Sequence, residues 1–275
     1  MKFTKMQGAG NDFIVIDNRT LNLPVETLCD IARTLCPRAM AVGADGLMAV
    51  VEPKAGGDFG MIFINADGSI GEMCGNGARC ICKYGYEKGI AGESMTVETT
   101  AGPVYGKRLS AMDYQIRLND VTKLSLDVNL NALGNVWNTA YVELGNPGLP
   151  HLVVEYPGLA KTEPAAIWEL GKALREHPDL PKGANVNFYE ITENGTIFER
   201  TFERGVEDFT YACGTGTGSV VTVLSEKGLV SGDHTAVEMA GGTLYVDVIR
   251  EGGKVKDLYL SGPAVIVYEG ERAEL

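Results

Sequence analysis

The sequence lacks the long apolar runs and the basic clusters that mark two large classes of protein. Its longest apolar runs, such as Phe13-Ile14-Val15-Ile16, have the length of a strand, whereas a membrane-spanning helix needs roughly 20 apolar residues. The formal net charge is −12 and no run of basic residues occurs, although nucleic-acid binding requires clustered lysine and arginine. We therefore expect neither a membrane nor a nucleic-acid partner, and we attribute the acidity to solubility.

Metal ligands are also scarce. The three histidines are scattered singly, and the six cysteines include no C-x-x-C pair. Among these histidines and cysteines, the only closely spaced pair of possible zinc ligands is Cys80 and Cys82. We expect no metal and no cofactor. The first thirteen residues contain no apolar core of a secretion signal, so we expect a cytoplasmic protein whose thiols stay reduced.

A repeated segment is the most informative feature that is present. Cys74–Gly77 reads CGNG, and ten residues later the chain reads Glu-Lys-Gly; Cys213–Gly216 reads CGTG, and ten residues later the chain again reads Glu-Lys-Gly. The similarity continues in residues 97–105 and 237–245, which are 140 positions apart. A repeat of about half the chain indicates two similar domains, because the repeats of solenoids are about 20–50 residues long.

Each copy predicts a strand, a turn and a helix. The expected strands cover residues 59–65 and 196–202, and the expected helices cover 75–88 and 214–227, with Gly89 and Gly228 closing them. Many small residues in both helices favour a helix enclosed by a sheet. Further strands are expected at 96–104, 243–249 and 255–260, and further helices at 24–36 and 163–176. The predicted fold class is α+β, with two pseudo-symmetric domains that each wrap a mostly antiparallel sheet around a central helix.

We place the first domain at residues 1–116 and the second at residues 117–262. The first carries Cys74 and the second carries Cys213. The tail 263–275 is expected to rejoin the first domain, with residues 262–268 adding a strand to it.

Cys74 and Cys213 are expected at helix N-termini, where unpaired N–H groups carry partial positive charge. A thiol in that position has its pKa lowered from about 8.5 into the range of about 3.5–7.5, and the same N–H groups hold an anion. If the two domains face each other, two thiols flank one carbon of a bound carboxylate. This is the arrangement needed for racemisation, because one thiolate removes the α-proton while the opposite thiol delivers a proton to the other face.

Other interpretations exist for both features. Cysteine is often a small buried hydrophobe, which is our interpretation of the four remaining cysteines, Cys29, Cys36, Cys80 and Cys82. The glycine-rich segment 214–218 suggests a phosphate-binding loop, but it lacks the Lys-Ser/Thr pair of a P-loop.

The sequence resembles the diaminopimelate epimerases, cofactor-independent enzymes of the proline-racemase-like fold. The matching segments span nearly the whole chain, and they are MKFTKMQGAGNDFIVID (1–17), GADG (43–46), NADGSIGEMCGNGARC (65–80), GNP (145–147), NVNF (185–188), ERG (203–205), ACGTG (212–216) and SGP (261–263). The family commonly has histidine at the position of Gln7, and commonly reads Asn-Pro-His where Gly148-Leu149-Pro150 here precede His151.

The resemblance implies an enzyme that interconverts LL- and meso-diaminopimelate, a small amino acid, as a homodimer. Cys74 and Cys213 would be the acid/base pair, with Cys213 accepting the proton from the LL isomer, and His151 and Glu203 would tune and orient the thiols. The implied substrate-binding residues are Asn11, Asn65, Gly75, Asn76, Asn146, Asn185, Arg204, Gly214 and Thr215.

Three alternatives remain open at this point. A racemase of the same fold acting on another amino acid, such as histidine, would use the same thiols. A non-catalytic protein that binds small carboxylates would not need them. A pyridoxal-phosphate racemase would need a Schiff-base lysine, which nothing in the sequence singles out.

Overall fold

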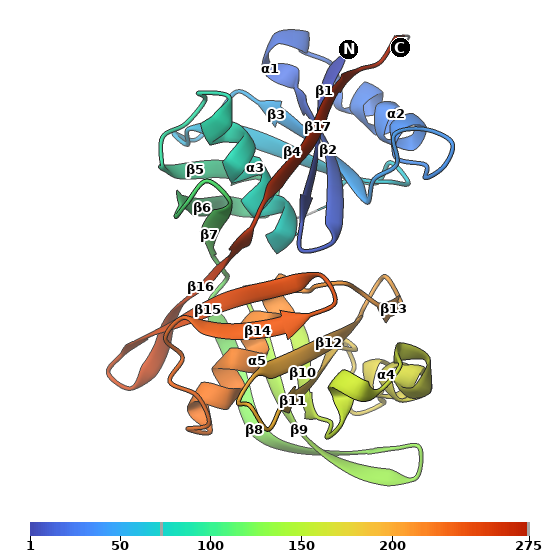
Figure 1. The fold of residues 1–275 in the computed structure, drawn as a ribbon, viewed down its shortest axis with the longest axis vertical. Helices are drawn as coiled ribbons and strands as arrows, with labels where there is room; N and C mark the ends of the chain where they lie inside the picture. Colours follow the sequence, from blue (N-terminus) through green and yellow to red (C-terminus); the bar gives the residue numbers. More distant parts are fainter. Residues whose placement is uncertain (72–73, 274–275) are drawn as a thin grey trace. The chain divides into compact units, whose positions relative to one another are not determined.

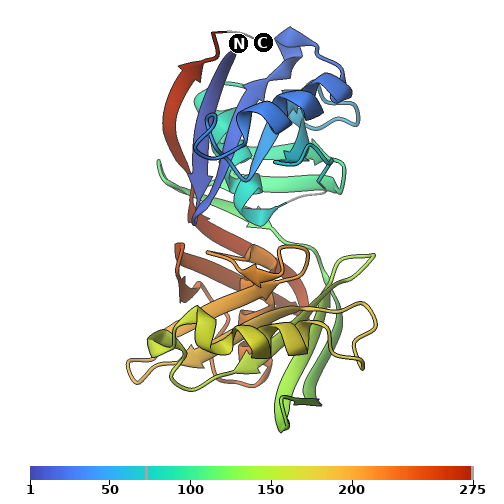
Figure 2. The same ribbon diagram turned by 90° about the vertical axis from the view of Figure 1, so that its right-hand side faces the viewer.

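The computed structural model describes residues 1–71 and 74–273 and is drawn in Figures 1 and 2. The chain divides into two compact units, unit 1 with Met1–Ile116 and Ser261–Leu275, and unit 2 with Arg117–Leu260. Strands dominate both units and helices are few, which confirms the predicted α+β class. Residues 72 and 73, which directly precede the first Cys-Gly motif, lie outside the described residues.

Unit 1 contains eleven of the elements. In chain order they are β1 (Lys2–Gly8), β2 (Asn11–Asp17), α1 (Asn18–Leu21), α2 (Val25–Leu35), β3 (Gly46–Val51), β4 (Phe59–Asn65), α3 (Gly75–Glu87), β5 (Ser94–Thr99), β6 (Gly102–Arg108), β7 (Asp113–Arg117, whose last residue belongs to unit 2) and β17 (Val265–Glu271).

Unit 2 follows β7 in the chain. Its elements are β8 (Val121–Ala132), β9 (Asn135–Leu144), β10 (Leu149–Glu155), η1 (Leu159–Lys161), η2 (Pro164–Ile167), α4 (Trp168–Arg175), β11 (Asn185–Ile191), β12 (Ile197–Glu203), β13 (Asp208–Phe209), α5 (Gly214–Glu226), β14 (Thr235–Met239), β15 (Gly242–Glu251) and β16 (Lys254–Pro263, which continues into unit 1).

The two units share one strand topology. In unit 1, β1 pairs antiparallel with β2, β2 parallel with β3, β3 antiparallel with β4, β4 parallel with β5, and β5 antiparallel with β6. In unit 2 the neighbouring strands alternate between antiparallel and parallel pairing in the same order, along β9, β10, β11, β12, β14 and β15. The register agrees as well, because Phe59 pairs with Val97 and Ile197 pairs with Val237. The repeat inferred from the two cysteine motifs is therefore a repeat of structure.

A helix lies against the inner face of the sheet in each unit, as the ribbons show (Figure 1). Helix α3 packs against β1, β2, β6 and β17, and α5 packs against β9, β10, β11 and β15. Close packing needs the small residues of these helices, since a Cβ added at Gly85 would lie 2.6 Å from the ring of Phe59. Gly89 and Gly228 adopt φ of 65° and 70° just past the helix ends, as predicted for closing glycines.

The other face of each sheet carries a second hydrophobic cluster. Helix α2 packs on β3 and β4, and α4 packs on β11 and β12. Successive side chains of a strand point to opposite faces, so each strand divides its residues between the two helices. In unit 2, Val186, Phe188 and Phe202 belong to the cluster under α4, which leaves their sequence neighbours to face α5.

The C-terminal strand returns to the first unit, as expected from the sequence. Strand β17 pairs antiparallel with β1, and the Met1 amino group and the Arg272 backbone N–H each donate to the other residue's carbonyl. The start of β1 and the end of β17 accordingly lie side by side (Figures 1 and 2). Across residues 1–71 and 74–273, none of the helices is long and apolar enough to span a membrane.

Candidate active site

Cys74 is the N-cap of α3, the position predicted for it. Its backbone is extended, with φ −116° and ψ 129°, and its carbonyl accepts the first helical hydrogen bond from Ala78 at 2.8 Å. The next residue but one, Asn76, is buried, and its Nδ2 donates to Asn11 Oδ1 at 2.6 Å. Arg79 donates to Asn76 Oδ1 at 2.8 Å. The turn between β1 and β2 is thus tied to the first turn of α3, which brings Asn11 to the Cys74 end of the helix.

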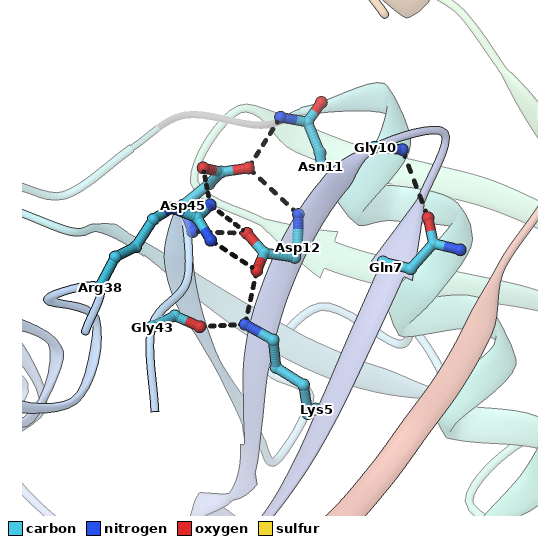
Figure 3. Close-up of polar contacts among 8 residues, drawn as sticks. All are labelled: Lys5, Gln7, Gly10, Asn11, Asp12, Arg38, Gly43 and Asp45. Atoms are coloured by element: carbon cyan, nitrogen blue, oxygen red, sulfur yellow. Dashed lines mark hydrogen bonds and ion pairs between the residues drawn. The ribbon is translucent and has the colours of Figure 1, made fainter. Parts of the chain in front are cut away.

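A cluster of charged residues fixes Asn11 from the other side (Figure 3). Asp45 Oδ2 accepts from Asn11 Nδ2 and from the Asp12 backbone N–H, both at 3.1 Å. Arg38 bonds both Asp12 and Asp45, and Lys5 bonds Asp12 and the carbonyl of Gly43. Burial opposes the charge on Asp12, but the hydrogen bonds from Arg38 and Lys5 prevail and lower its pKa to about 2. The Asp12 carboxylate therefore stays charged at neutral pH, and the cluster holds the Asn11 amide in one orientation.

Two further residues border this half of the site. Asn65 ends β4, its Nδ2 donates to Ser69 Oγ at 2.9 Å, and the following residue, Ala66, donates to the Asp45 carbonyl at 3.2 Å. Asn65 therefore lies next to the charged cluster. Gln7 Oε1 accepts from the Gly10 N–H at 3.3 Å and closes the turn before Asn11 (Figure 3).

Cys213 is the N-cap of α5 and occupies the equivalent position in unit 2. Its side chain is 8% exposed, and its Sγ lies 3.6 Å from Thr215 Oγ1. Gly214 and Gly216 flank Thr215 in the first turn of the helix. The thiol thus lies beside the backbone N–H groups of the first turn of α5. Two of the first three residues of this helix are glycines, so no side chain covers their N–H groups.

The expectation of a lowered thiol pKa is wrong for Cys213. Burial, and after it the charge of Glu203, raise the pKa of this thiol well above its ordinary value. Hydrogen bonds from Thr215 and from the Gly216 backbone act in the opposite direction and only in part offset them. The helix N-terminus is present as predicted, but desolvation of the charged form outweighs it.

The predicted unit 2 residues gather on the strands that face α5. His151 on β10 pairs with Asn185 on β11, and both are buried. Asn185 Oδ1 accepts from the Arg204 backbone N–H at 2.8 Å, and the Arg204 guanidinium donates to the Lys182 carbonyl at 2.8 Å. Within residues 1–71 and 74–273, Arg204 forms no ion pair with a carboxylate. Its charge therefore remains available for an acidic ligand.

His151 is neutral and Glu203 holds its proton more tightly than usual. Burial lowers the pKa of His151 to about 3, against a hydrogen bond from Asn187, whose Nδ2 lies 3.3 Å from His151 Nδ1. Nε2 then carries the hydrogen, and it has no hydrogen-bond partner among the described residues. Burial also raises the pKa of Glu203. Both groups are predicted to tune the thiol; the charge of Glu203, when it is ionised, raises the pKa of Cys213.

Asn146 stands apart from the other predicted residues. It is exposed in the connection between β9 and β10, where the Asn146–Pro147 peptide bond is cis. In the part of the chain that the structure describes, its side chain forms no hydrogen bond, so nothing in unit 2 holds it toward Cys213.

Sequence reasoning missed the polar residues beneath the first turn of α5. Asn187, Glu199, Thr201 and Thr217 are all buried, and they are bonded to one another. The strand pattern held a signal, because Glu199, Thr201 and Glu203 alternate along β12 and so share one face. Among the described residues, no three histidine, cysteine, aspartate or glutamate side chains are grouped as metal ligands.

The chain shares its fold with a class of two-unit proteins whose structures are solved. A hydroxyproline epimerase from Agrobacterium vitis is similar in structure, with a TM-score of 0.68 and 16% identity over 98% of this chain and 91% of that one. A phenazine biosynthesis protein of the PhzF family from Enterococcus faecalis reaches a TM-score of 0.71 with 15% identity over 99% of both chains. At these identities the likeness defines the fold alone.

Sequence comparison then narrows the class to one family. The family model described as diaminopimelate epimerase matches residues 3–108 and 144–267. Diaminopimelate epimerases from Aquifex aeolicus and Chlorobaculum tepidum are each 36% identical to this chain, covering 100% and 96% of it and 98% of each relative. The relative from Methanococcus maripaludis is 32% identical over 98% of this chain and 99% of its own. The chain belongs to the diaminopimelate epimerase family.

Proposed function

We propose that this protein interconverts LL- and meso-diaminopimelate with two cysteines as the acid/base pair. The observation that carries the proposal is the duplicated placement of Cys74 and Cys213. Each is the N-cap of the helix enclosed by its unit, and each is followed by a glycine-rich first turn. Family membership supports the substrate, and the paired thiols support the reaction.

The proton transfers follow from the roles of the two thiols. One cysteine, as thiolate, takes the α-proton of the substrate and becomes a thiol, while the other, as thiol, gives its proton to the opposite face of the same carbon and becomes a thiolate. The electron pair of the broken C–H bond passes to the α-carbon and its carboxylate before the new C–H bond forms. The N–H groups of Gly75 and Asn76 and of Gly214 and Thr215 are proposed to hold that carboxylate and stabilise its added charge.

The raised pKa of Cys213 suits a difficult proton abstraction. The α-proton of an amino acid is a very weak acid, so a thiolate of high pKa is the stronger base toward it. The cost is a smaller fraction of thiolate at neutral pH. His151 is buried and neutral, so it adds no charge that would change the fraction of Cys213 thiolate.

The distal end of the substrate is proposed to bind Arg204 and the asparagines. The Arg204 guanidinium donates to the Lys182 carbonyl and, among the described residues, forms no ion pair with a carboxylate; a guanidinium binds a carboxylate through paired N–H donors. Asn11, Asn65 and Asn146 are proposed to bind the remaining polar groups. Diaminopimelate carries both a distal carboxylate and a distal amine, which this set of groups would satisfy.

The test is incubation of the protein in D₂O with a panel of amino acids. Mass spectrometry should show α-deuterium in LL- and meso-diaminopimelate, and chiral chromatography should show their interconversion. Exchange into histidine alone would identify a racemase of another amino acid. Binding of diaminopimelate without any exchange would identify the non-catalytic carboxylate-binding protein and refute the proposal.

The assembly and location of the protein are further proposals. The family resemblance implies a homodimer that works in the cytoplasm. Light scattering on the purified protein should give twice the 29.4 kDa mass of the chain, and a monomeric mass at micromolar concentration would contradict the dimer.

A further inference from the structure

The buried carboxyl group under the first turn of α5 has no part in the proposed proton transfers. Glu199 is 2% exposed. Its Oε2 lies 2.7 Å from Thr217 Oγ1, and its Oε1 lies 3.3 Å from Thr201 Oγ1. A Cβ added at Gly216 would lie 3.2 Å from Glu199 Oε1. The carboxyl group therefore packs directly against the turn that follows Cys213.

The Thr217 hydroxyl joins this carboxyl group to the start of α5. The Cys213 carbonyl accepts from the Thr217 backbone N–H at 2.9 Å, so it does not depend on the Thr217 hydroxyl, which lies at the same distance. Thr217 Oγ1 donates to Glu199 Oε2, at the shorter distance of 2.7 Å. Burial raises the pKa of Glu199 to about 8, against the hydrogen bonds from Thr217 and Thr201.

The first turn of α5 needs such an anchor. Gly214 and Gly216 occupy two of its first three positions, and each glycine costs a helix about 1 kcal/mol relative to alanine. Thr217 is the first residue of this turn whose side chain reaches the sheet, and its bonds join the carbonyl of Cys213 to strand β12.

We propose that Glu199 is a positioning residue for Cys213: it accepts a hydrogen bond from the Thr217 hydroxyl and so fixes the helical turn that carries the thiol. The inference rests on the proposed function only for its effect on turnover. Its effect on the thiol itself holds whatever the substrate is.

The charged and titratable groups near Cys213 define a second effect. Glu199 and Glu203 extend from β12, His151 lies on β10, and Arg204 follows β12. Neutral Glu199 adds no charge near the thiol. Once ionised at alkaline pH, it disfavours the Cys213 thiolate.

Three variants test the proposal. Glu199→Gln keeps an oxygen that accepts from Thr217 but never ionises. Thr217→Val removes the hydroxyl group and with it the hydrogen bond to Glu199. Thr222→Val is the matched control, because Thr222 is buried in the same helix and its hydroxyl donates to the Gly218 carbonyl of that helix at 2.7 Å.

The first measurement is alkylation of Cys213 by iodoacetamide between pH 6 and 10, followed by peptide mass spectrometry. Glu199→Gln should move the midpoint pH of Cys213 alkylation down by about one unit, the size of pKa shift that a nearby charge causes. Thr222→Val should leave this midpoint in place. An unchanged midpoint in Glu199→Gln would overturn the proposal, even if the protein proved inactive on diaminopimelate.

The second measurement is epimerisation of LL-diaminopimelate at pH 7.5, with thermal unfolding to verify that each variant is folded. Thr217→Val should lower kcat/KM about tenfold, which corresponds to one buried hydrogen bond, whereas Glu199→Gln should retain most of it. A folded Thr217→Val variant with the kcat/KM of Thr222→Val, or Glu199→Gln as impaired as Thr217→Val, would show that Glu199 does not position the thiol. Failure of the wild-type protein to epimerise would refute the proposed function instead.

Discussion

At the scale of single residues, the protonation of Cys213 determines how the proposed reaction depends on pH. Its folded-state pKa lies well above the ordinary value because the thiol is buried and faces Glu203. Below that pKa, the fraction of thiolate rises about tenfold for each unit of pH. We expect kcat/KM for diaminopimelate to increase steadily from pH 6 to pH 8.5, since His151 is already neutral above about pH 3.

A pH series of initial rates provides the check. Glu203→Gln removes the neighbouring negative charge and should shift the increase to lower pH, whatever its effect on the maximum rate. A kcat/KM that is flat or falls over the same range would show that the rate does not depend on forming the Cys213 thiolate.

Arg204 carries a second prediction at this scale. Its guanidinium is proposed to bind the distal carboxylate through two parallel hydrogen bonds, which the single ammonium of lysine cannot reproduce. Arg204→Lys should reduce kcat/KM for diaminopimelate by about tenfold to a hundredfold, the range of a hydrogen bond to a charged group. An equal loss on a substrate analogue without a distal carboxylate would show that Arg204 supports the fold through Lys182 and Asn185.

The sequence revealed some residues of the site and hid others for physical reasons. Cys74 and Cys213 could be found because their motifs are duplicated and because both lie where a helix begins. The pKa of Cys213 could not be predicted, since it is set first by burial of the thiol, which depends on how the strands of unit 2 pack around α5. Glu199 was hidden for the same reason, because its role depends on Thr217 packing over β12.

At the scale of helices and strands, α3 and α5 are equivalent but are not packed equally tightly. Gly77 and Gly216 occupy the same position in the two helices. A Cβ at Gly77 would find its nearest neighbour, Phe13, at 3.4 Å, whereas a Cβ at Gly216 would lie 2.2 Å from Asn187 Oδ1. The Asn187 amide cannot move aside cheaply, because its Nδ2 donates to the Leu152 carbonyl at 2.9 Å.

Gly216→Ala should therefore destabilise the protein by about 1–3 kcal/mol, the usual cost of overpacking. Gly77→Ala is the matched control and should be neutral or slightly stabilising, since alanine favours a helix. Urea unfolding followed by circular dichroism measures both. Equal stability of the two variants would mean that Asn187 and the first turn of α5 are not held as tightly as the contacts indicate.

Much of the secondary structure was predictable because the local signals agreed with the fold. Strand β4 covers the predicted residues 59–65, and α3 and α5 each end one residue before the predicted limit. Periodicity and closing glycines sufficed for these elements. The pairing of β2 with β3 and of β10 with β11 was not predictable, because parallel strands joined through helices leave no local pattern in the sequence.

At the scale of the whole molecule, the two-thiol proposal has a redox consequence. Thiols that act on opposite faces of one carbon are close enough, without substrate, for their sulfurs to approach bonding distance of about 2.05 Å. Mild oxidation should abolish activity by linking Cys74 to Cys213, a thiol reductant should restore it, and substrate should protect. Cys80 and Cys82 are fully buried inside α3 and should not react.

Peptide mapping of the oxidised protein identifies the linked cysteines. A bond that involves Cys80 or Cys82, or oxidation that leaves the rate unchanged, would show that the two N-cap thiols do not face one substrate.

The most direct test of the central claim is epimerisation of LL-diaminopimelate by Cys74→Ala and by Cys213→Ala, each measured against the wild-type protein by chiral chromatography. Each variant lacks the proton carrier for one face of the α-carbon, so each should lose epimerisation by at least about a thousandfold, within the range of acid/base catalysis. Circular dichroism should confirm that both variants remain folded. Full activity in either single variant would contradict the two-thiol mechanism.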